Sequence, residues 1–405
     1  MGYFEKTLRG LTYQSLMRVS IRVLSFAKWV IVARMLGPVE LGLFGIASIS
    51  LSFIETITET GIFVFLIQEK DKYSKYLSSA LIISIIRGIL ISFIIAIGSS
   101  FVLFFFNMQG SRNILFLVAV VPLMRGFINP SIIKYEIDLK FEKEIILRLF
   151  LYSIDVAVSI YFAYKYRVAE SLIAGIFFAV LVELVFSWMF ISPKPYLKTN
   201  IRQIKYIIKQ GKWITFTGIF NYLFHNLDDI VVGKILGVYS LGVYQISYKI
   251  AALPIYEISE IFGKVTLPIY TKISFDKNRV KSAFFKTTII ISLISIFACT
   301  VLFVFAEEIV IFVLGEKWFE AMNIIKILAV FSLIRSISGS VTPFLYALKR
   351  QDEVVRYIFA GFLALSLLIV PMTIKMGIVG AAYSTIFATL FTLPFIWKSL
   401  KKVLF

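Results

Sequence analysis

The chain has 405 residues, of which 59% are hydrophobic and 16% are charged, and its mean hydropathy is +0.88. A water-soluble globular fold needs more polar residues than this to cover its surface, so the composition excludes that class. The net charge of +18 would suit nucleic acid binding, but the basic residues collect in alternate loops between apolar segments. This distribution predicts a membrane protein with no nucleic acid partner.

Apolar segments long enough to cross a bilayer as helices recur along the chain, and we expect about twelve of them. The expected spans lie near residues 11–33, 41–67, 78–105, 112–133, 149–164 and 171–192, and then near 213–233, 241–271, 283–305, 322–348, 357–374 and 377–397. The predicted fold class is therefore all-α integral membrane. It has two six-helix lobes, residues 1–198 and 199–405, around a central cavity.

The distribution of Lys and Arg predicts the topology. The segments 1–10, 68–77, 134–148, 193–212, 272–286, 349–356 and 398–405 contain 26 of these residues, whereas the intervening loops contain seven. By the positive-inside rule, both termini and the first set of segments are cytoplasmic, and the number of spans is even. The first apolar segment has no small-residue cleavage site, so we expect an uncleaved span.

A repeat relates the two halves of the sequence. Residues 33–44 (ARMLGPVELGLF) align without gaps on residues 233–244 (GKILGVYSLGVY), and both glycine–leucine pairs of the motif are identical. Convergence of short Gly-rich turns is the alternative, but the exact register argues against it. Six spans separate the copies, so the halves share one membrane orientation and are related by a pseudo-twofold axis along the membrane normal. Substrate is then expected between the halves.

The segment 193–212 joins the halves and carries six basic and no acidic residues. Its basic residues recur at helical spacing beside Ile201, Ile204 and Ile208. This pattern predicts an amphipathic linker helix over residues 199–212 that lies on the cytoplasmic leaflet.

Charged residues inside the expected spans are the candidates for a functional site. The basic ones are Arg18, Arg22, Lys28, Arg87, Arg125, Lys249, Lys264, Lys326 and Arg335, and the acidic ones are Glu55, Glu59, Asp155, Glu183, Asp228, Asp229, Glu257 and Glu260. A charge at the centre of the bilayer costs about 3 kcal/mol on the insertion scale. We therefore expect these side chains to face protein or water.

Two groups of these residues predict binding functions. The proposed substrate-binding cations are Arg18, Arg22, Lys28, Arg87, Arg125, Lys249 and Arg335. They would line a cavity for an anionic substrate, because guanidinium groups match phosphate oxygens; the alternative is buried pairing with the acids. The proposed ion-coupling residues are His225, Asp228, Asp229, Glu55 and Glu59. They would bind a proton or cation, with salt bridging as the alternative. We expect no catalytic residue, no metal site and no cofactor.

Several short segments resemble one family. They are residues 33–44, Glu59-Thr-Gly-Ile62 followed by Leu66-Ile-Gln68, Phe312-Val-Leu-Gly-Glu-Lys-Trp-Phe-Glu-Ala321 and Gly377-Ile-Val-Gly-Ala-Ala382. In this order they resemble the polysaccharide-transport branch of the multidrug/oligosaccharidyl-lipid/polysaccharide (MOP) exporter superfamily, the Wzx-type flippases of lipid-linked oligosaccharides. The resemblance covers the whole chain. The related lipid II flippases usually carry two further C-terminal spans, which this chain lacks.

The resemblance implies a MATE-like fold whose lobes open inward and outward in turn. It implies a flippase in the bacterial cytoplasmic (inner) membrane that moves an undecaprenyl-diphosphate-linked repeat unit of O-antigen, capsule or a related polysaccharide to the outer leaflet. A cationic cavity suits the diphosphate. The implied partners are this lipid-linked oligosaccharide and the membrane lipids, with H⁺ or Na⁺ as a candidate counter-ion and a polysaccharide polymerase as a candidate protein partner.

Two other functions remain as alternatives. A drug or small-cation exporter of the same fold would favour an acidic or aromatic cavity. A membrane-embedded glycosyltransferase, polymerase or ligase would need catalytic acids or bases at the outer face. The longest expected external interval, residues 306–321, contains four glutamates but no Asp-x-Asp, His-x-x-x-Glu or nucleophile-elbow motif. The sequence therefore favours a transporter over an enzyme.

Overall fold

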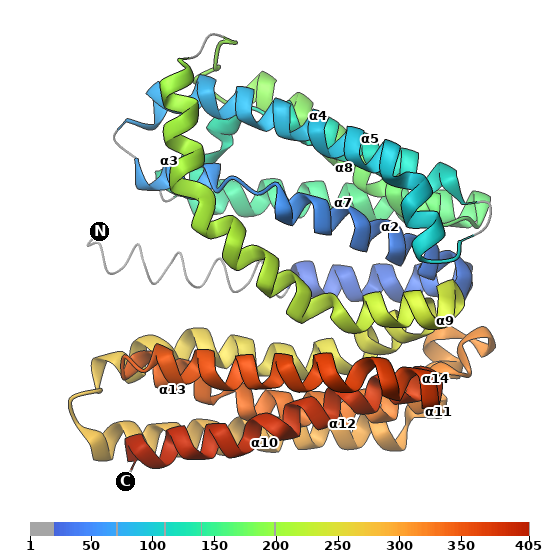
Figure 1. Cartoon of the computed structure of the whole chain (residues 1–405), viewed down its shortest axis with the longest axis vertical. Helices are drawn as coiled ribbons and strands as arrows, with labels where there is room; N and C mark the ends of the chain where they lie inside the picture. Colours follow the sequence, from blue (N-terminus) through green and yellow to red (C-terminus); the bar gives the residue numbers. More distant parts are fainter. Residues whose placement is uncertain (1–19, 70–71, 109–110, 139, 198–199, 405) are drawn as a thin grey trace. The chain divides into compact units, whose positions relative to one another are not determined.

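The computed structural model describes residues 20–69, 72–108, 111–138, 140–197 and 200–404, and the described part is helical throughout, without a strand (Figure 1). A helix over residues 20–35 is followed by α2 (Pro38–Ile57), α3 (Ile62–Gln68), α4 (Tyr73–Phe105), α5 (Arg112–Gly126), η1 (Pro130–Ile133), α6 (Lys134–Ile137), α7 (Phe141–Tyr166) and α8 (Glu170–Phe190). Then come α9 (Ile201–Lys272), α10 (Lys277–Val304), α11 (Ala306–Ile309), η2 (Val310–Leu314), η3 (Glu316–Trp318), α12 (Ala321–Gly339), α13 (Val341–Ala347) and α14 (Gln351–Leu404).

Eight helices of the described residues are long and apolar enough to cross a membrane, or nine if α5 and the η1–α6 segment, bent by 69°, form one span. Two of these helices are broken at glycines with left-handed φ angles, Gly237 in α9 (82°) and Gly377 in α14 (61°). A residue with a side chain rarely adopts such a φ. Two of the expected spans adjoin each break. The chain is thus a multi-pass membrane protein, and the count of twelve spans stays a prediction.

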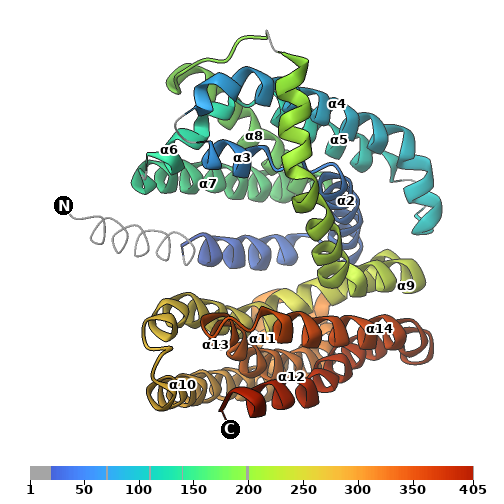
Figure 2. The ribbon, with the colours of Figure 1, turned by 60° about the vertical axis from the view of Figure 1, so that its left-hand side comes forward.

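The helices fall into two compact units. The first comprises Met1–Leu36 and Leu43–Asn226, and the second comprises Gly37–Gly42 and Leu227–Phe405. In the first unit α4 packs on α5 and α7 on α8, and in the second α12 packs on both α10 and α14 (Figures 1 and 2). The expected lobe boundary at residues 198 and 199 falls outside the described residues, so that division of the chain stays a prediction.

The first turns of α9 form the helix that the sequence predicts for the linker. Ile207 is fully buried in a cluster with residues of α3 and α4, among them Phe65 and Leu77, and Ile204 packs against the same cluster. Ile201 and Ile208 are exposed. Of the three isoleucines that define the predicted apolar face, Ile201 and Ile208 are therefore the ones that could rest on a membrane.

The two copies of the repeat meet inside the second unit. The Cα of Gly42 lies so close to the main-chain carbonyl of Val238 that a Cβ at this position would overlap the oxygen. The Cα of Gly242 lies in the same way against the carbonyl of Pro38. Pro38 and Val238 are also equivalent in the repeat, so the contact is reciprocal, as a pseudo-twofold relation between the copies requires.

Candidate functional site

A cavity of about 540 Å³ lies in the first unit, between residues of α2, α4, α5, α7 and α8 and the η1–α6 segment. Its charged lining residues are Glu55, Glu59, Arg87, Arg125, Glu136, Glu144, Arg148 and Glu183. The volume is within the range of about 300–1,000 Å³ that is usual for small-ligand sites. Four of the predicted site residues are therefore brought together here, but the lining contains more glutamates than arginines.

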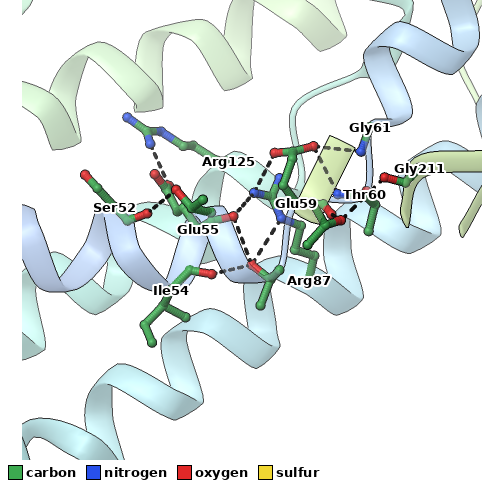
Figure 3. A network of polar contacts seen from close by, with 12 residues as sticks. Ser52, Ile54, Glu55, Glu59, Thr60, Gly61, Arg87, Arg125 and Gly211 are labelled. Carbon is green, nitrogen blue, oxygen red and sulfur yellow. Dashed lines mark hydrogen bonds and ion pairs between the residues drawn. The ribbon is translucent and has the colours of Figure 1, made fainter. Parts of the chain in front are cut away.

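Two arginines of the cavity, Arg125 and Arg87, contact the end of α2 (Figure 3). Arg125 of α5 makes the simpler contact. Its Nη1 lies 2.7 Å from Oε1 of Glu55, and this is the one hydrogen bond that we find for it among the described residues. The Arg125 side chain is 43% exposed and that of Glu55 is 25% exposed. The remaining guanidinium donors can therefore reach a ligand in the cavity without disturbing the main chain.

Arg87 of α4 is held more firmly in the same network (Figure 3). Its Nη2 lies 2.8 Å from Oε2 of Glu59 and donates to the main-chain carbonyl of Glu55 at 2.7 Å, while Nε donates to Oγ1 of Thr58 at 3.4 Å. The guanidinium group thus closes the end of α2, where the last carbonyls have no partner within the helix. This arrangement fixes the Arg87 guanidinium group against the end of α2.

Glu59 uses its two carboxylate oxygens for different purposes. Oε2 pairs with Arg87, whereas Oε1 accepts hydrogen bonds from the backbone N–H groups of Thr60 and Gly61, at 3.1 and 2.9 Å (Figure 3). Gly61 has a left-handed φ of 64° and precedes the first turn of α3. The Glu-Thr-Gly segment therefore forms a carboxylate-stabilised turn between α2 and α3, which gives a structural reason for this motif.

Lys28 and Asp155 form a buried ion pair elsewhere in the first unit. Nζ of Lys28 lies 2.8 Å from Oδ1 and 2.7 Å from Oδ2 of Asp155, which is on α7. The Ser159 hydroxyl also donates to Oδ1, at 3.2 Å, and Gly175 of α8 packs directly over this group. The two charged side chains are only 6% and 11% exposed. Lys28 therefore adopts the buried pairing that the sequence left open as an alternative to substrate binding.

The other basic candidate of this helix is Arg22, which lies exposed on the helix over residues 20–35. Arg18 lies outside the described residues. His225, on α9, is exposed, and its ring makes an edge contact with Phe224 at 5.2 Å between centroids. Neither Arg22 nor His225 is among the residues that line the 540 Å³ cavity.

A second group of predicted residues lies in the second unit, on both sides of the α9 break. Oδ2 of Asp228 accepts a hydrogen bond from the Tyr244 hydroxyl at 2.8 Å, and Oδ2 of Asp229 accepts one from Nε2 of Gln245 at 3.1 Å. The carboxylates interact electrostatically with two predicted cations, Asp228 with Arg335 and Asp229 with Lys249. Arg335 also lies over the ring of Phe331, at 5.5 Å. These two aspartates thus bridge the two halves of α9 by side-chain bonds.

Sequence reasoning missed three lining residues of the cavity, Glu136, Glu144 and Arg148. Arg148 bonds Glu144 through Nε at 2.7 Å and lies 3.5 Å from Glu136. The sequence predicts a cytoplasmic loop for all three, since the apolar run of the fifth span begins only at residue 149. However, α7 begins at Phe141. The signal that could have revealed this was the spacing of Glu144 and Arg148, four residues apart on one helix face.

The fold is that of known membrane transporters. A lipid II flippase, MurJ, in an inward closed conformation, superimposes with a TM-score of 0.78 over 96% of this chain and 87% of that chain, at 15% sequence identity. An inward-facing multidrug resistance MATE family transporter of the MOP superfamily gives a TM-score of 0.65 over 95% and 97% of the two chains, at 14% identity. The predicted all-α integral membrane fold of the MATE-like type is confirmed.

The family follows from sequence comparison. The model of the family described as "Polysaccharide biosynthesis protein" matches residues 31–323, and the chain belongs to this family. An uncharacterized membrane protein in the cps region of Klebsiella pneumoniae is 25% identical over 93% of this chain and 78% of its own length. Lipopolysaccharide biosynthesis protein WzxC of Escherichia coli K12 is 23% identical over 91% and 76% of the chains. Teichuronic acid biosynthesis protein TuaB of Bacillus subtilis 168 is 22% identical over 86% and 72%.

Proposed function

We propose that this protein is a flippase that moves an undecaprenyl-diphosphate-linked oligosaccharide from the inner to the outer leaflet of a bacterial cytoplasmic membrane by alternating access. The membership of the polysaccharide biosynthesis family and the fold shared with a lipid II flippase support this proposal. So do relatives whose names refer to lipopolysaccharide and teichuronic acid biosynthesis. In this proposal both termini and the segment 193–212 are cytoplasmic, because basic residues concentrate there.

The observation that carries the proposal is the mixed lining of the cavity in the first unit. Such a substrate presents phosphate oxygens, which accept hydrogen bonds, and sugar hydroxyls, which also donate them. Arginine is the side chain best suited to phosphate, and carboxylates accept bonds from hydroxyl groups. In this proposal Arg125, which pairs with Glu55, binds the diphosphate, and Glu136, Glu144 and Glu183 bind sugar hydroxyls.

Binding by this route is an exchange of partners. With the cavity free of substrate, the Glu55 carboxylate neutralises Arg125 at 2.7 Å. A diphosphate oxygen would take over the guanidinium donors, and the Glu55 carboxylate would turn to a sugar hydroxyl or to water. An exposed ion pair contributes only about 0–1 kcal/mol, so breaking it opposes substrate binding weakly.

Substitution of Arg125 tests the proposal. The Arg125→Gln variant should lose surface polysaccharide in a strain that lacks the wild-type gene, and Arg125→Lys should retain part of it, because loss of a charged partner typically costs about 2–5 kcal/mol. The purified variant in proteoliposomes should flip lipid-linked oligosaccharide at least about 30-fold more slowly. Normal flipping by Arg125→Gln at wild-type protein level would contradict the assignment.

One observation favours a second function, export of cationic drugs. The cavity lining contains five glutamates and three arginines, and an acidic lining suits a cation. If the protein is such an exporter, its expression should lower the accumulation of ethidium in cells, and Arg125→Gln should leave this activity intact. If the protein is a flippase, its expression should leave ethidium accumulation unchanged, and Arg125→Gln should lose the transport activity.

We further propose that Asp228 and Asp229 couple flipping to a gradient of H⁺ or Na⁺. Adjacent carboxylates near the membrane interior repel each other, and a bound proton or cation relieves the repulsion. The side-chain amides of the Asp228→Asn and Asp229→Asn variants can still accept the bonds from Tyr244 and Gln245. We expect the variant proteins to bind lipid-linked sugar, while their flipping in proteoliposomes no longer responds to an imposed pH or Na⁺ gradient. Indifference of the wild-type protein to both gradients would remove this part of the proposal.

A further inference from the structure

A second hollow lies in the second unit, away from the residues considered so far. It is a groove of about 740 Å³ between the two halves of α14. Its lining residues recur at helical spacing on each half, so that one face of each half is turned to the groove. The halves also touch each other, since a Cβ on Gly361 would come within 2.8 Å of Cγ2 of Thr392.

One end of the groove is basic. Arg356, Lys398 and Lys402 line this end together with Glu353, which is buried. Oε1 of Glu353 lies 2.8 Å from Nζ of Lys402 and 3.2 Å from Nη1 of Arg356, while Oε2 accepts a bond from the Ser399 hydroxyl at 2.8 Å. Two cations thus share one carboxylate while Lys398 keeps its charge beside them, so the end of the groove has a net positive charge.

The cations of this cluster are available to a ligand. Arg356 and Lys402 remain 60% and 41% exposed although Glu353 fixes their positions. Lys398 is exposed and makes no hydrogen bond or ion pair with the part of the chain that the structure describes. An anion at this end would therefore meet donors that are already oriented and would not have to displace Glu353.

The rest of the groove is apolar and open. Phe359, Leu363, Leu367, Phe391 and Phe395 line it with exposed side chains, above a floor that includes Ala360 and Ala364. From Phe359 to Leu368 the helix advances about 14 Å at ~1.5 Å per residue, which is close to half of the ~30 Å hydrocarbon core. The apolar part therefore has the depth of one leaflet.

The basic end lies at the level of the membrane surface by two criteria. Trp397, beside Lys398, is exposed, and tryptophan is enriched at the membrane–water interface. The segments 349–356 and 398–405 are also among the basic segments that the proposed topology places in the cytoplasm. The cytoplasmic leaflet is the one that carries anionic lipids at its surface.

We propose that this groove binds an anionic phospholipid of the cytoplasmic leaflet, with its phosphate at Arg356, Lys398 and Lys402 and an acyl chain along the apolar part. The net positive charge at the mouth selects an anionic headgroup over a zwitterionic one. The single-leaflet depth matches an acyl chain. The site is separate from the cavity of the first unit and does not depend on what that cavity transports.

Native mass spectrometry of the purified protein tests this site. The probes are phosphatidylglycerol and phosphatidylcholine at equal concentrations, and we expect the wild-type protein to retain phosphatidylglycerol in preference. Each basic residue near a headgroup contributes about a fivefold preference. The triple variant that combines Arg356→Gln, Lys398→Gln and Lys402→Gln should therefore lower the retained phosphatidylglycerol on the order of 100-fold. Lys398→Gln alone, which breaks no contact, should lower it by about fivefold.

The matched control removes the same charge from another basic segment. Lys272, Arg279 and Lys286 are exposed, and replacing all three by Gln should leave phosphatidylglycerol retention unchanged. Equal retention of the two phospholipids by the wild-type protein would overturn the proposal. So would unchanged retention in the Lys398→Gln variant.

Displacement of phosphatidylglycerol by a polyprenyl phosphate, with loss of polyprenyl binding in the same variants, would assign the groove to the substrate tail instead. Because the readout is lipid binding, failure here would leave the flippase proposal untouched.

Discussion

Two ion pairs in the first unit have nearly the same length and very different surroundings. Lys28 and Asp155 meet at 2.7 Å with side chains 6% and 11% exposed, and Arg125 and Glu55 meet at 2.7 Å with side chains 43% and 25% exposed. A buried ion leaves a large desolvation penalty when its partner is lost, whereas water readily replaces the partner of an exposed one. Because it is buried, the Lys28–Asp155 pair should hold its helices together. The more exposed Arg125–Glu55 pair can open at little cost, as the proposed exchange of Glu55 for a substrate requires.

The largest loss of stability should come from breaking the buried ion pair between Lys28 and Asp155. Lys28→Met leaves the Asp155 carboxylate buried with Ser159 as its remaining hydrogen-bond donor, and we expect the variant to lose about 3–5 kcal/mol of stability. Thermal unfolding of the detergent-solubilised protein measures this loss. As a control, Lys28→Met combined with Asp155→Leu should recover most of it, because no buried charge remains. A single variant as stable as the wild type would show that the pair is not structural.

We expect an intermediate loss of stability from substitution of Arg87. This side chain is partly exposed but makes three contacts at the end of α2. Arg87→Gln removes the ion pair with Glu59 and the bond to the Glu55 carbonyl, and hydrogen bonds to charged groups contribute about 1.5–3 kcal/mol. The same unfolding measurement checks this. Flipping by the remaining folded protein should be close to normal, since Arg87 positions the turn. Loss of flipping without loss of stability would instead make Arg87 a substrate contact.

The smallest effect on stability should occur at Arg125. Arg125→Gln removes one exposed pair, so its unfolding should change by no more than about 1 kcal/mol, although flipping is lost. Glu55→Gln is the matched variant, because it removes the other partner and leaves the guanidinium free. We expect it to bind lipid-linked oligosaccharide more tightly than the wild type does. Weaker binding by Glu55→Gln would show that the carboxylate itself contacts the substrate.

Local features of the molecule could be predicted from the sequence, and distant pairings could not. Apolar runs identify the membrane helices because span length is set by the bilayer, and the repeat at residues 33–44 and 233–244 identifies the two-part design. The partner of Lys28 lies 127 residues away and that of Arg125 lies 70 residues away. Nothing near either residue distinguishes their roles, since both sit in apolar helices and the distinction arises only from packing.

The extent of the helices was also set by tertiary structure. The charged stretch before residue 149 was assigned to a loop by its polarity, yet α7 begins at Phe141 and directs Glu144 and Arg148 into the cavity. Charged side chains do not end a helix where residues four apart can pair on one helix face. Here they pair with each other at 2.7 Å, which allows the helix to continue.

The reciprocal glycine contact of the repeat limits which substitutions each half of the chain can accept. Gly42 is restricted by the carbonyl of Val238, and Gly242 is restricted by that of Pro38. Main-chain atoms are present whatever the residue type, so mutation of the facing residue cannot create room for a side chain. After a duplication, each copy therefore imposes purifying selection on the other copy's glycine, while the positions around it drift. The glycine that is retained at this position in both copies is then the residue of the motif least free to change after a duplication.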